Sequence, residues 1–271
     1  MRLRHAAGFI VLAAVAAAPL AAQRNEQTSE FKWGEQLASG RWVRIANLNG
    51  KITVGQASGD RVELVATKHW RRGNPDDVRI EARKDGDDIV ICALYGRQNS
   101  CDDDRWGSSR NRRRGWDDNW NDDDDVWVDF SVLIPKAARV RTASVNGSTT
   151  ITGATGEVNA STVNGEIRVE SGAGPINASG VNGRIYARIT GAAANAPMDF
   201  STVNGSVVLE VPDNFGADVT MTSVNGGLES DFPLTVSGRI DPRHMTVHVG
   251  GSGGPRVTLS TVNGVIELRK R

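Results

Sequence analysis

A tripeptide that recurs at nearly constant spacing constrains this sequence more than any other feature. Val-Asn-Gly occurs six times, and a Leu-Asn-Gly relative ends at Gly50. The spacings between successive glycines from Gly147 are 18, 18, 22, 21 and 38 residues, and we read the last as two units of 19. A fixed period near 20 residues is typical of stacked, similar units. The predicted corners are Asn146 and Gly147, Asn164 and Gly165, Asn182 and Gly183, Asn204 and Gly205, Asn225 and Gly226, and Asn263 and Gly264.

Alternating apolar residues flank every corner. In the second repeat, Val158 and Ala160 precede the corner, and Ile167 and Val169 follow it at the same two-residue interval. The intervening positions hold Ser, Thr, Asn, Glu or Arg. This alternation is the signature of half-buried strands, and no stretch after the N-terminal segment has a helical period.

The Asn-Gly pairs indicate how the strands are joined. Both residues tolerate a positive φ, so each pair would form a tight corner at little steric cost. Each unit alone has too few apolar residues for a core, so stacking is needed to bury them. We therefore expect an all-β, stacked-rung β-solenoid, similar to a β-helix, whose corner asparagines hydrogen-bond in a ladder. A meander of antiparallel hairpins is the alternative.

The N-terminus predicts export. A short basic head containing Arg2 and Arg4 precedes an apolar run of about 13 residues and then Ala21-Ala22. That run is shorter than the roughly 20 residues of a membrane anchor. We expect a signal peptide at 1–22, a linker at 23–38 and the repeat domain at 39–271, in the periplasm or at the cell surface. The formal charge of zero falls to about −2 without the two arginines, which argues against a nucleic-acid partner.

One segment breaks the strand pattern. Residues 96–125 contain nine Asp, six Arg and three Trp, and no aliphatic residue. Such a segment cannot bury enough surface to fold alone, so we expect a disordered, low-complexity insertion. Its candidate binding residues are Trp106, Trp116 and Trp120, which could stack on sugars or make other surface contacts. Its runs of Asp could also bind calcium, although their spacing does not match an EF-hand loop. Cys92 and Cys101 are expected to form a disulfide at its base.

Two stretches resemble a known family. They are 130–136, Phe-Ser-Val-Leu-Ile-Pro-Lys, and 251–266, which closes the chain with a Val-Asn-Gly repeat. They are similar to the bacterial "putative adhesin" domain, an exported β-solenoid family of unknown function, over about 39–271. The resemblance implies the solenoid fold and an adhesin-like role, and it brings no catalytic residues. The insertion at 96–125 is not part of the family pattern.

Other candidate sites have simpler interpretations. His244 and His248 should lie about 13 Å apart on the outside of one strand, too far to share a metal. Charged residues such as Glu170, Arg188 and Glu210 follow the corners, as in polysaccharide lyases built on β-helices, but cross-strand pairing explains them equally well. The strand before each corner carries small polar groups four and six residues before the glycine. These are Ala143, Ser161, Ser179, Ser201, Thr222 and Ser260, with Asn159, Asn177, Asp199, Thr220 and Thr258.

Together these features predict a non-catalytic, exported, adhesin-like binding or structural module that presents repetitive polar β-surfaces. We expect no cofactor and no metal. The expected partner is a protein or glycan of the cell envelope, or another copy of the chain. The alternative is an enzyme that acts on cell-wall or extracellular polysaccharide.

Overall fold

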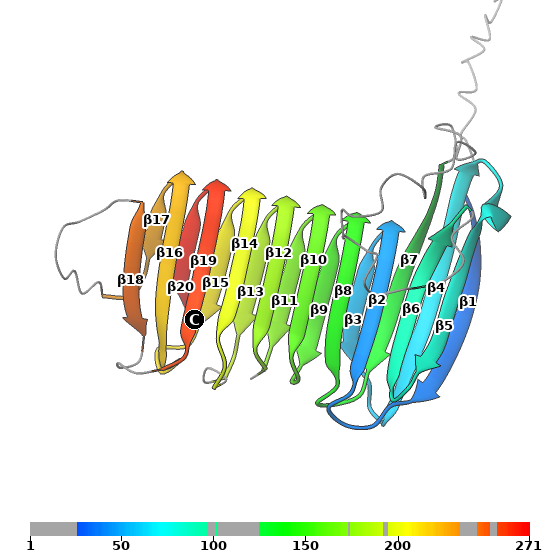
Figure 1. Cartoon of the computed structure of the whole chain (residues 1–271), viewed down its shortest axis with the longest axis horizontal. Helices are drawn as coiled ribbons and strands as arrows, with labels where there is room; N and C mark the ends of the chain where they lie inside the picture. The colour runs from blue at the N-terminus through cyan, green and yellow to red at the C-terminus, as the bar shows by residue number, and fades with distance from the viewer. Residues whose placement is uncertain are drawn as a thin grey trace, which may run out of the picture.

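The computed structural model describes residues 26–96, 101, 125–172, 174–191, 195–233, 243–249 and 254–271. These residues form an all-β structure whose strands stack along one long axis (Figure 1). The only helical element in them is a single 3-10 turn, η1 (Pro75–Asp77). No helix in these ranges is long and apolar enough to span a membrane. The predicted signal peptide at 1–22 lies outside the described residues.

The strands form two ten-stranded sheets. In spatial order, the first sheet contains β1 (Gln27–Gln36), β4 (Arg61–Arg72), β7 (Asp125–Ile134), β3 (Ile52–Gln56), β9 (Thr149–Ala154), β11 (Ile167–Ser171), β13 (Ile185–Ile189), β15 (Val207–Val211), β20 (Ile266–Lys270) and β17 (Leu228–Ser230). The second contains β18 (His244–Val249), β16 (Ala217–Asn225), β19 (Arg256–Asn263), β14 (Met198–Asn204), β12 (Ile176–Asn182), β10 (Val158–Asn164), β8 (Arg139–Asn146), β2 (Trp42–Asn49), β6 (Asp88–Tyr95) and β5 (Val78–Asp85).

Each repeat gives one strand to each sheet, and neighbouring repeats pair in parallel. Asn164 lies opposite both Asn146 and Asn182, so consecutive corners are in register. Beyond the corner, Ile167 lies opposite Thr149 and Ile185 in the first sheet. Parallel pairing excludes the meander of hairpins for these repeats, because hairpin neighbours run antiparallel. The predicted alternation is confirmed, since Val158, Ala160, Ile167 and Val169 are all buried.

The Leu-Asn-Gly relative joins the same stack from far away in the sequence. β2 pairs in parallel with β8, and Asn49 lies opposite Asn146. Between these two repeats the chain adds β4 to β7, in which β4 pairs antiparallel with β1 and β7, and β5 pairs antiparallel with β6. The strands β4 to β7, together with β1, therefore form one end of the stack (Figure 1).

The reading of the 38-residue spacing as two sequential units of 19 is wrong. After β17 the chain returns as β18, which runs antiparallel along the outside of β16. The last repeat then pairs with β14 on one side and β16 on the other, so it lies between two repeats that precede it in sequence. β18 occupies one edge of β16, and β19 pairs with the other edge. The order of the strands in the sheet therefore differs here from their order in the chain.

The expectation of a linker at 23–38 is also corrected in its described part. β1 forms a ten-residue strand that pairs antiparallel with β4 along its whole length. Phe31 and Trp33 alternate along it and pack against the core while most of the other residues are exposed. This short alternation of two apolar residues was not recognised in the sequence because most residues around it are polar.

One hydrophobic core runs between the sheets. The buried polar side chains beside it differ in whether they have a hydrogen-bond partner. In three regular repeats the inward threonine three residues before the corner glycine donates to the carbonyl of the adjacent glycine, as Thr162 Oγ1 does to Gly147 at 3.3 Å. In the first regular repeat Thr142, Ser144 and Thr149 are buried, but their hydroxyls have no partner among the described residues. Asn47 in the neighbouring strand donates to Val128 O at 2.7 Å, while its Oδ1 is likewise without a partner in these ranges.

Candidate functional site: the outer face of the second sheet

The outer face of the second sheet carries three parallel rows of side chains. Alternate residues of β10 point outward, and the in-register pairing repeats them on β12, β14, β19 and β16. The hydroxyl row is Ser161, Ser179, Ser201, Ser260 and Thr222, the polar row is Asn159, Asn177, Asp199, Thr258 and Thr220, and the valine row is Val163, Val181, Val203, Val262 and Val224. The valines are 39 to 49% exposed, which makes this row a line of apolar contacts on a polar face.

Hydrogen bonds order the polar row. Asn177 Nδ2 donates to Asn159 Oδ1 at 3.0 Å, and Asn177 Oδ1 accepts from the backbone N–H of Asp199 at 3.1 Å. A shallow, open hollow of about 410 Å³ lies over this part of the sheet. Its outward groups are Arg141, Asn159, Ser161, Asn177, Ser179 and Asp199. Such a surface offers closely spaced donors and acceptors to a ligand that lies flat on it.

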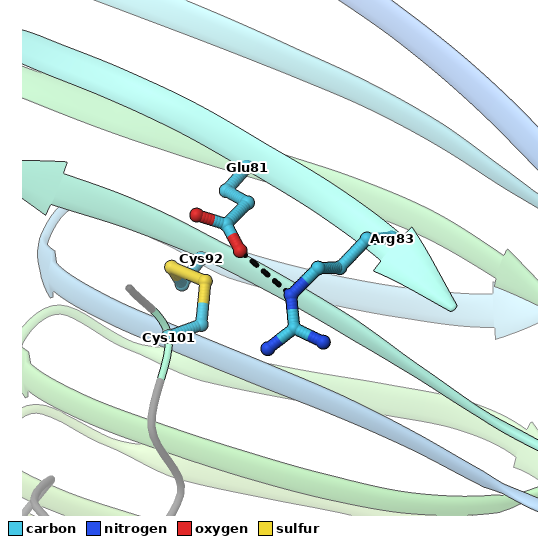
Figure 2. The surroundings of a disulfide bond; sticks show 4 residues. All are labelled: Glu81, Arg83, Cys92 and Cys101. Atoms are coloured by element: carbon cyan, nitrogen blue, oxygen red, sulfur yellow. Dashed lines mark hydrogen bonds and ion pairs between the residues drawn. A yellow bond between two sulfur atoms is a disulfide. The ribbon is translucent and has the colours of Figure 1, made fainter. Parts of the chain in front are cut away.

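The disulfide lies on this same face. Cys92 and Cys101 are bonded, which confirms the predicted pairing (Figure 2). Cys92 on β6 lies opposite Ala46, which in turn lies opposite Ala143 and so continues the line of the hydroxyl row. Val90, Leu94 and both cysteines form a small apolar cluster on this side of the sheet. The disulfide therefore lies in line with the hydroxyl row, two strands beyond Ala143 at the end of the stack that contains β1.

The strand beyond the disulfide extends the line further. Glu81 on β5 lies opposite Cys92 and accepts a hydrogen bond from Arg83 Nε at 2.8 Å (Figure 2). Sequence reasoning placed the cysteines at the base of the insertion but could not place them on this face, because the register between β6 and β2 carries no motif. Trp106, Trp116 and Trp120 lie outside the described residues.

The predicted corner residues form a continuous asparagine ladder along one side of the stack. Six of its seven members donate through Nδ2 to Oδ1 of the neighbouring asparagine on the Asn49 side, at 2.8 to 3.0 Å. The ladder is Asn49, Asn146, Asn164, Asn182, Asn204, Asn263 and Asn225, in spatial order. The predicted ladder is thus confirmed, and it contains the Leu-Asn-Gly relative.

The expectation of positive φ holds for glycine at three corners but not for asparagine. Gly50, Gly165 and Gly183 have φ of +114°, +157° and +154°, whereas no ladder asparagine has a positive φ. Close approach gives a second reason for glycine. A Cβ built on Gly183 would lie 2.0 Å from the carbonyl oxygen of Gly165, and the same clash recurs at the other stacked corners.

The outer face of the first sheet carries paired charges. Arg188 lies 3.2 Å from Glu210 on the next strand, which confirms that cross-strand pair, whereas Glu170 pairs with Arg168 on its own strand at 2.9 Å. Tyr186 donates to Glu210 at 2.5 Å, and Arg168 lies 4.3 Å from its ring centroid. Glu170 and Glu210 are therefore both engaged by neighbouring side chains.

The same contacts shift two pKa values. Burial raises the pKa of the Tyr186 phenol, and its hydrogen bond to Glu210 raises it further. Burial alone would raise the pKa of Glu210, but the hydrogen bonds from Tyr186 and Arg188 outweigh that effect and lower it. Glu210 is therefore a stabilised carboxylate and not a proton donor at neutral pH.

The histidines do not gather into a metal site. His244 and His248 are exposed on β18, as predicted, where they contact Thr222 and Asp218 at 3.0 and 2.6 Å. Across the described ranges no three His, Cys, Asp or Glu side chains converge as metal ligands. His69 on β4 stacks on Trp127 of β7 with ring centroids 5.1 Å apart.

Comparisons with known proteins find only distant likeness. No protein-family model and no curated protein matches the chain. Among solved structures, a "putative cell adhesion protein" from Clostridium sporogenes aligns over 90% of this chain and 100% of its own, at 10% identity and a TM-score of 0.45. A "putative adhesin" from Bacteroides fragilis aligns over 90% and 97%, at 10% identity and a TM-score of 0.39. A "putative adhesin" from Parabacteroides distasonis aligns over 89% of this chain and 97% of its own, at 12% identity and a TM-score of 0.31. Likeness at this level is too weak to say what the chain binds.

Proposed function

We propose that this chain is an exported, non-catalytic, adhesin-like β-solenoid module that binds its partner through the outer face of the second sheet. The observation that carries the proposal is the in-register repetition of the hydroxyl, polar and valine rows over five strands. A flat face with repeated donors, acceptors and small apolar groups suits an extended partner that makes the same contact several times.

The proposed domain is the stack itself, which β1 extends back from residue 39 to Gln27 and which runs to residue 271, preceded by a signal peptide at 1–22. Two features support export. The N-terminal sequence has the three-part layout of a signal peptide. The disulfide between Cys92 and Cys101 suits an oxidising compartment, either the periplasm or the cell surface.

The proposed partner is a glycan or a protein of the cell envelope. The hollow near Asn159 and Asn177 offers amide and hydroxyl groups that match either the hydroxyls of a sugar or the peptide groups of a protein. The insertion is proposed as a second contact. Because its disulfide lies in line with the hydroxyl row, a partner that covers the row would reach the base of the insertion.

The test is binding to arrayed envelope glycans and to extracted envelope proteins, with turnover assayed on every glycan bound. We expect binding without new reducing ends or unsaturated products. The double variant Ser179→Lys, Ser201→Lys should abolish binding, because two long charged side chains would project from the hydroxyl row and keep the partner off the face. Thr150→Lys on the outer face of the first sheet is the matched control and should bind normally. Product formation would contradict the non-catalytic role.

A second variant separates the face from the insertion. Replacing residues 102–122 by a short Gly-Ser linker keeps both cysteines. If the face carries the contact, binding weakens but persists, whereas complete loss in a folded variant would move the site to the insertion. Normal binding by the Ser179 and Ser201 variant would refute the proposed face.

A further inference from the structure

Asn-Gly pairs have a chemical weakness that this fold suppresses unequally. The backbone nitrogen of the glycine can attack the side-chain carbonyl carbon of the preceding asparagine, because glycine offers no side chain to hinder the approach. The attack needs that nitrogen to lose its proton, and it needs the asparagine side chain to turn towards it. A hydrogen bond donated by the glycine N–H opposes the first, and an immobilised asparagine side chain opposes the second, so a structure that provides either slows the reaction.

The stack occupies the attacking nitrogen in six of the seven corners. The N–H of Gly50, Gly147, Gly165, Gly183 and Gly205 each donates to the asparagine carbonyl of the next strand at 2.9 to 3.0 Å. Gly264 donates to the carbonyl of Asn225 at 3.2 Å. Gly226 is the seventh, and its N–H has no acceptor among the described residues.

The stack also holds the asparagine side chains, again unequally. An interior asparagine such as Asn182 donates to Asn164 and accepts from Asn204, both at 2.8 Å. Asn225 stands at the end of the ladder and donates to Asn263 at 3.0 Å. No described residue donates to its Oδ1. Asn49 ends the ladder on the other side, but the nitrogen of Gly50 is held.

The segment that follows Asn225 is short and exposed. Gly226 is followed by Gly227, where a built Cβ would meet nothing within 4 Å. The strand that follows, β17, has only three residues, and none of them is buried. Short, exposed segments at the end of a stack open at lower free energy than its interior.

We propose that Asn225 is the site at which this chain deamidates spontaneously, while the other six Asn-Gly corners are protected by stacking. A base in solution takes the proton of the Gly226 amide, and the nitrogen forms a bond to Cγ of Asn225. The bond from Cγ to Nδ2 breaks, and ammonia leaves a cyclic succinimide. Water then opens the ring at either carbonyl to give aspartate or isoaspartate, so the net change is one water gained and one ammonia lost.

The product would loosen one end of the binding face. A carboxylate cannot donate to Asn263 Oδ1, so the last hydrogen bond of the ladder is replaced by two acceptors that face each other. That change weakens the contact between β16 and β19, and with it the position of Thr222 at the end of the hydroxyl row. The reaction would therefore act on the terminal repeat alone.

Peptide mapping of the folded protein, incubated at mildly alkaline pH, tests this proposal. The conversion of all seven asparagines is followed by mass spectrometry, and the same protein in denaturant serves as the control. We expect similar rates at all corners in denaturant. In the folded protein, Asn225 should convert at least about tenfold faster than Asn182, which corresponds to an opening free energy about 1.4 kcal/mol lower.

Three results would overturn it. They are equal rates at Asn225 and Asn182 in the folded protein, faster conversion at Asn182, or an intact Asn225 after the denatured control has reacted. An Asn225→Gln variant verifies the assignment, because glutamine keeps the amide but would form the cyclic intermediate far more slowly. The variant should lose the fast phase and leave conversion at the other six sites unchanged.

Discussion

The middle of the stack and its two ends are built from the same kind of strand, but they differ in how chain order maps onto space. From β8 to β15, repeats that are consecutive in sequence are also neighbours in the stack. At the ends, antiparallel strands interrupt the series, and the last repeat lies between two earlier ones. All seven asparagines nevertheless fall into one ladder. The corner thus determines the register of a repeat, while the connections determine its place in the stack.

The largest expected effect tests close stacking at the corners. Gly183→Ala would place a Cβ 2.0 Å from a backbone oxygen that cannot move without disturbing the next repeat. We expect a loss of about 3 kcal/mol or more in the free energy of unfolding. Gly59→Ala, where nothing lies within 4 Å, should change it by less than about 0.5 kcal/mol. Equal urea midpoints for the two variants would contradict the steric role of the corner glycines.

The comparison explains which parts of the fold could be predicted from sequence. Strands, faces and the ladder follow from short-range rules, so residues such as Val158 and Ile167 could be assigned as core from their distance to a corner. The place of β19 could not, because its neighbours are chosen by which strand edges remain available. The position of Cys92 was not predictable either. It lies opposite Ala46 on β2, and β6, the strand that carries Cys92, contains no Asn-Gly corner from which its register could be counted.

The candidate site was predictable in part for the same reason. The hydroxyl and polar rows follow from counting back from each glycine, and both appear on one face. The order of their members, with Ser260 before Thr222, depends on the inserted last repeat and was not predictable. His69 on Trp127 depends on an antiparallel register within the irregular end of the stack, which no repeat indicates.

A pair of threonine variants compares a regular repeat with the first one. Thr162→Val removes a hydroxyl that donates to Gly147 O, so it should lower the free energy of unfolding by about 1 kcal/mol. Thr142→Val removes a buried hydroxyl without a partner in the described structure, so it should be neutral or stabilise by up to about 1 kcal/mol. Denaturant unfolding of both measures the difference. Equal destabilisation by both variants would show that Thr142 is satisfied in solution.

The smallest expected effect concerns the ladder. Asn182→Ala removes two exposed side-chain hydrogen bonds, and Asn225→Ala removes one. We expect a loss of about 1 kcal/mol or less for the interior position, and about half of that at the end. Thermal unfolding of the two variants would measure it. A larger effect at Asn225 would mean that the ladder does not distribute its stabilisation along the stack.

The position of the last repeat is the central claim, and paired cysteines test it most directly. Ser201 lies opposite Ser260, so their Cα atoms should be one strand spacing apart, about 4.8 Å, which a disulfide can bridge. Thr222 lies one strand further, at about twice that distance. After mild oxidation, non-reducing peptide mapping should find a new bridge in the variant with Ser201→Cys and Ser260→Cys, and none with Ser201→Cys and Thr222→Cys. A bridge only in the second variant would contradict the account, because it would place the repeats in simple chain order.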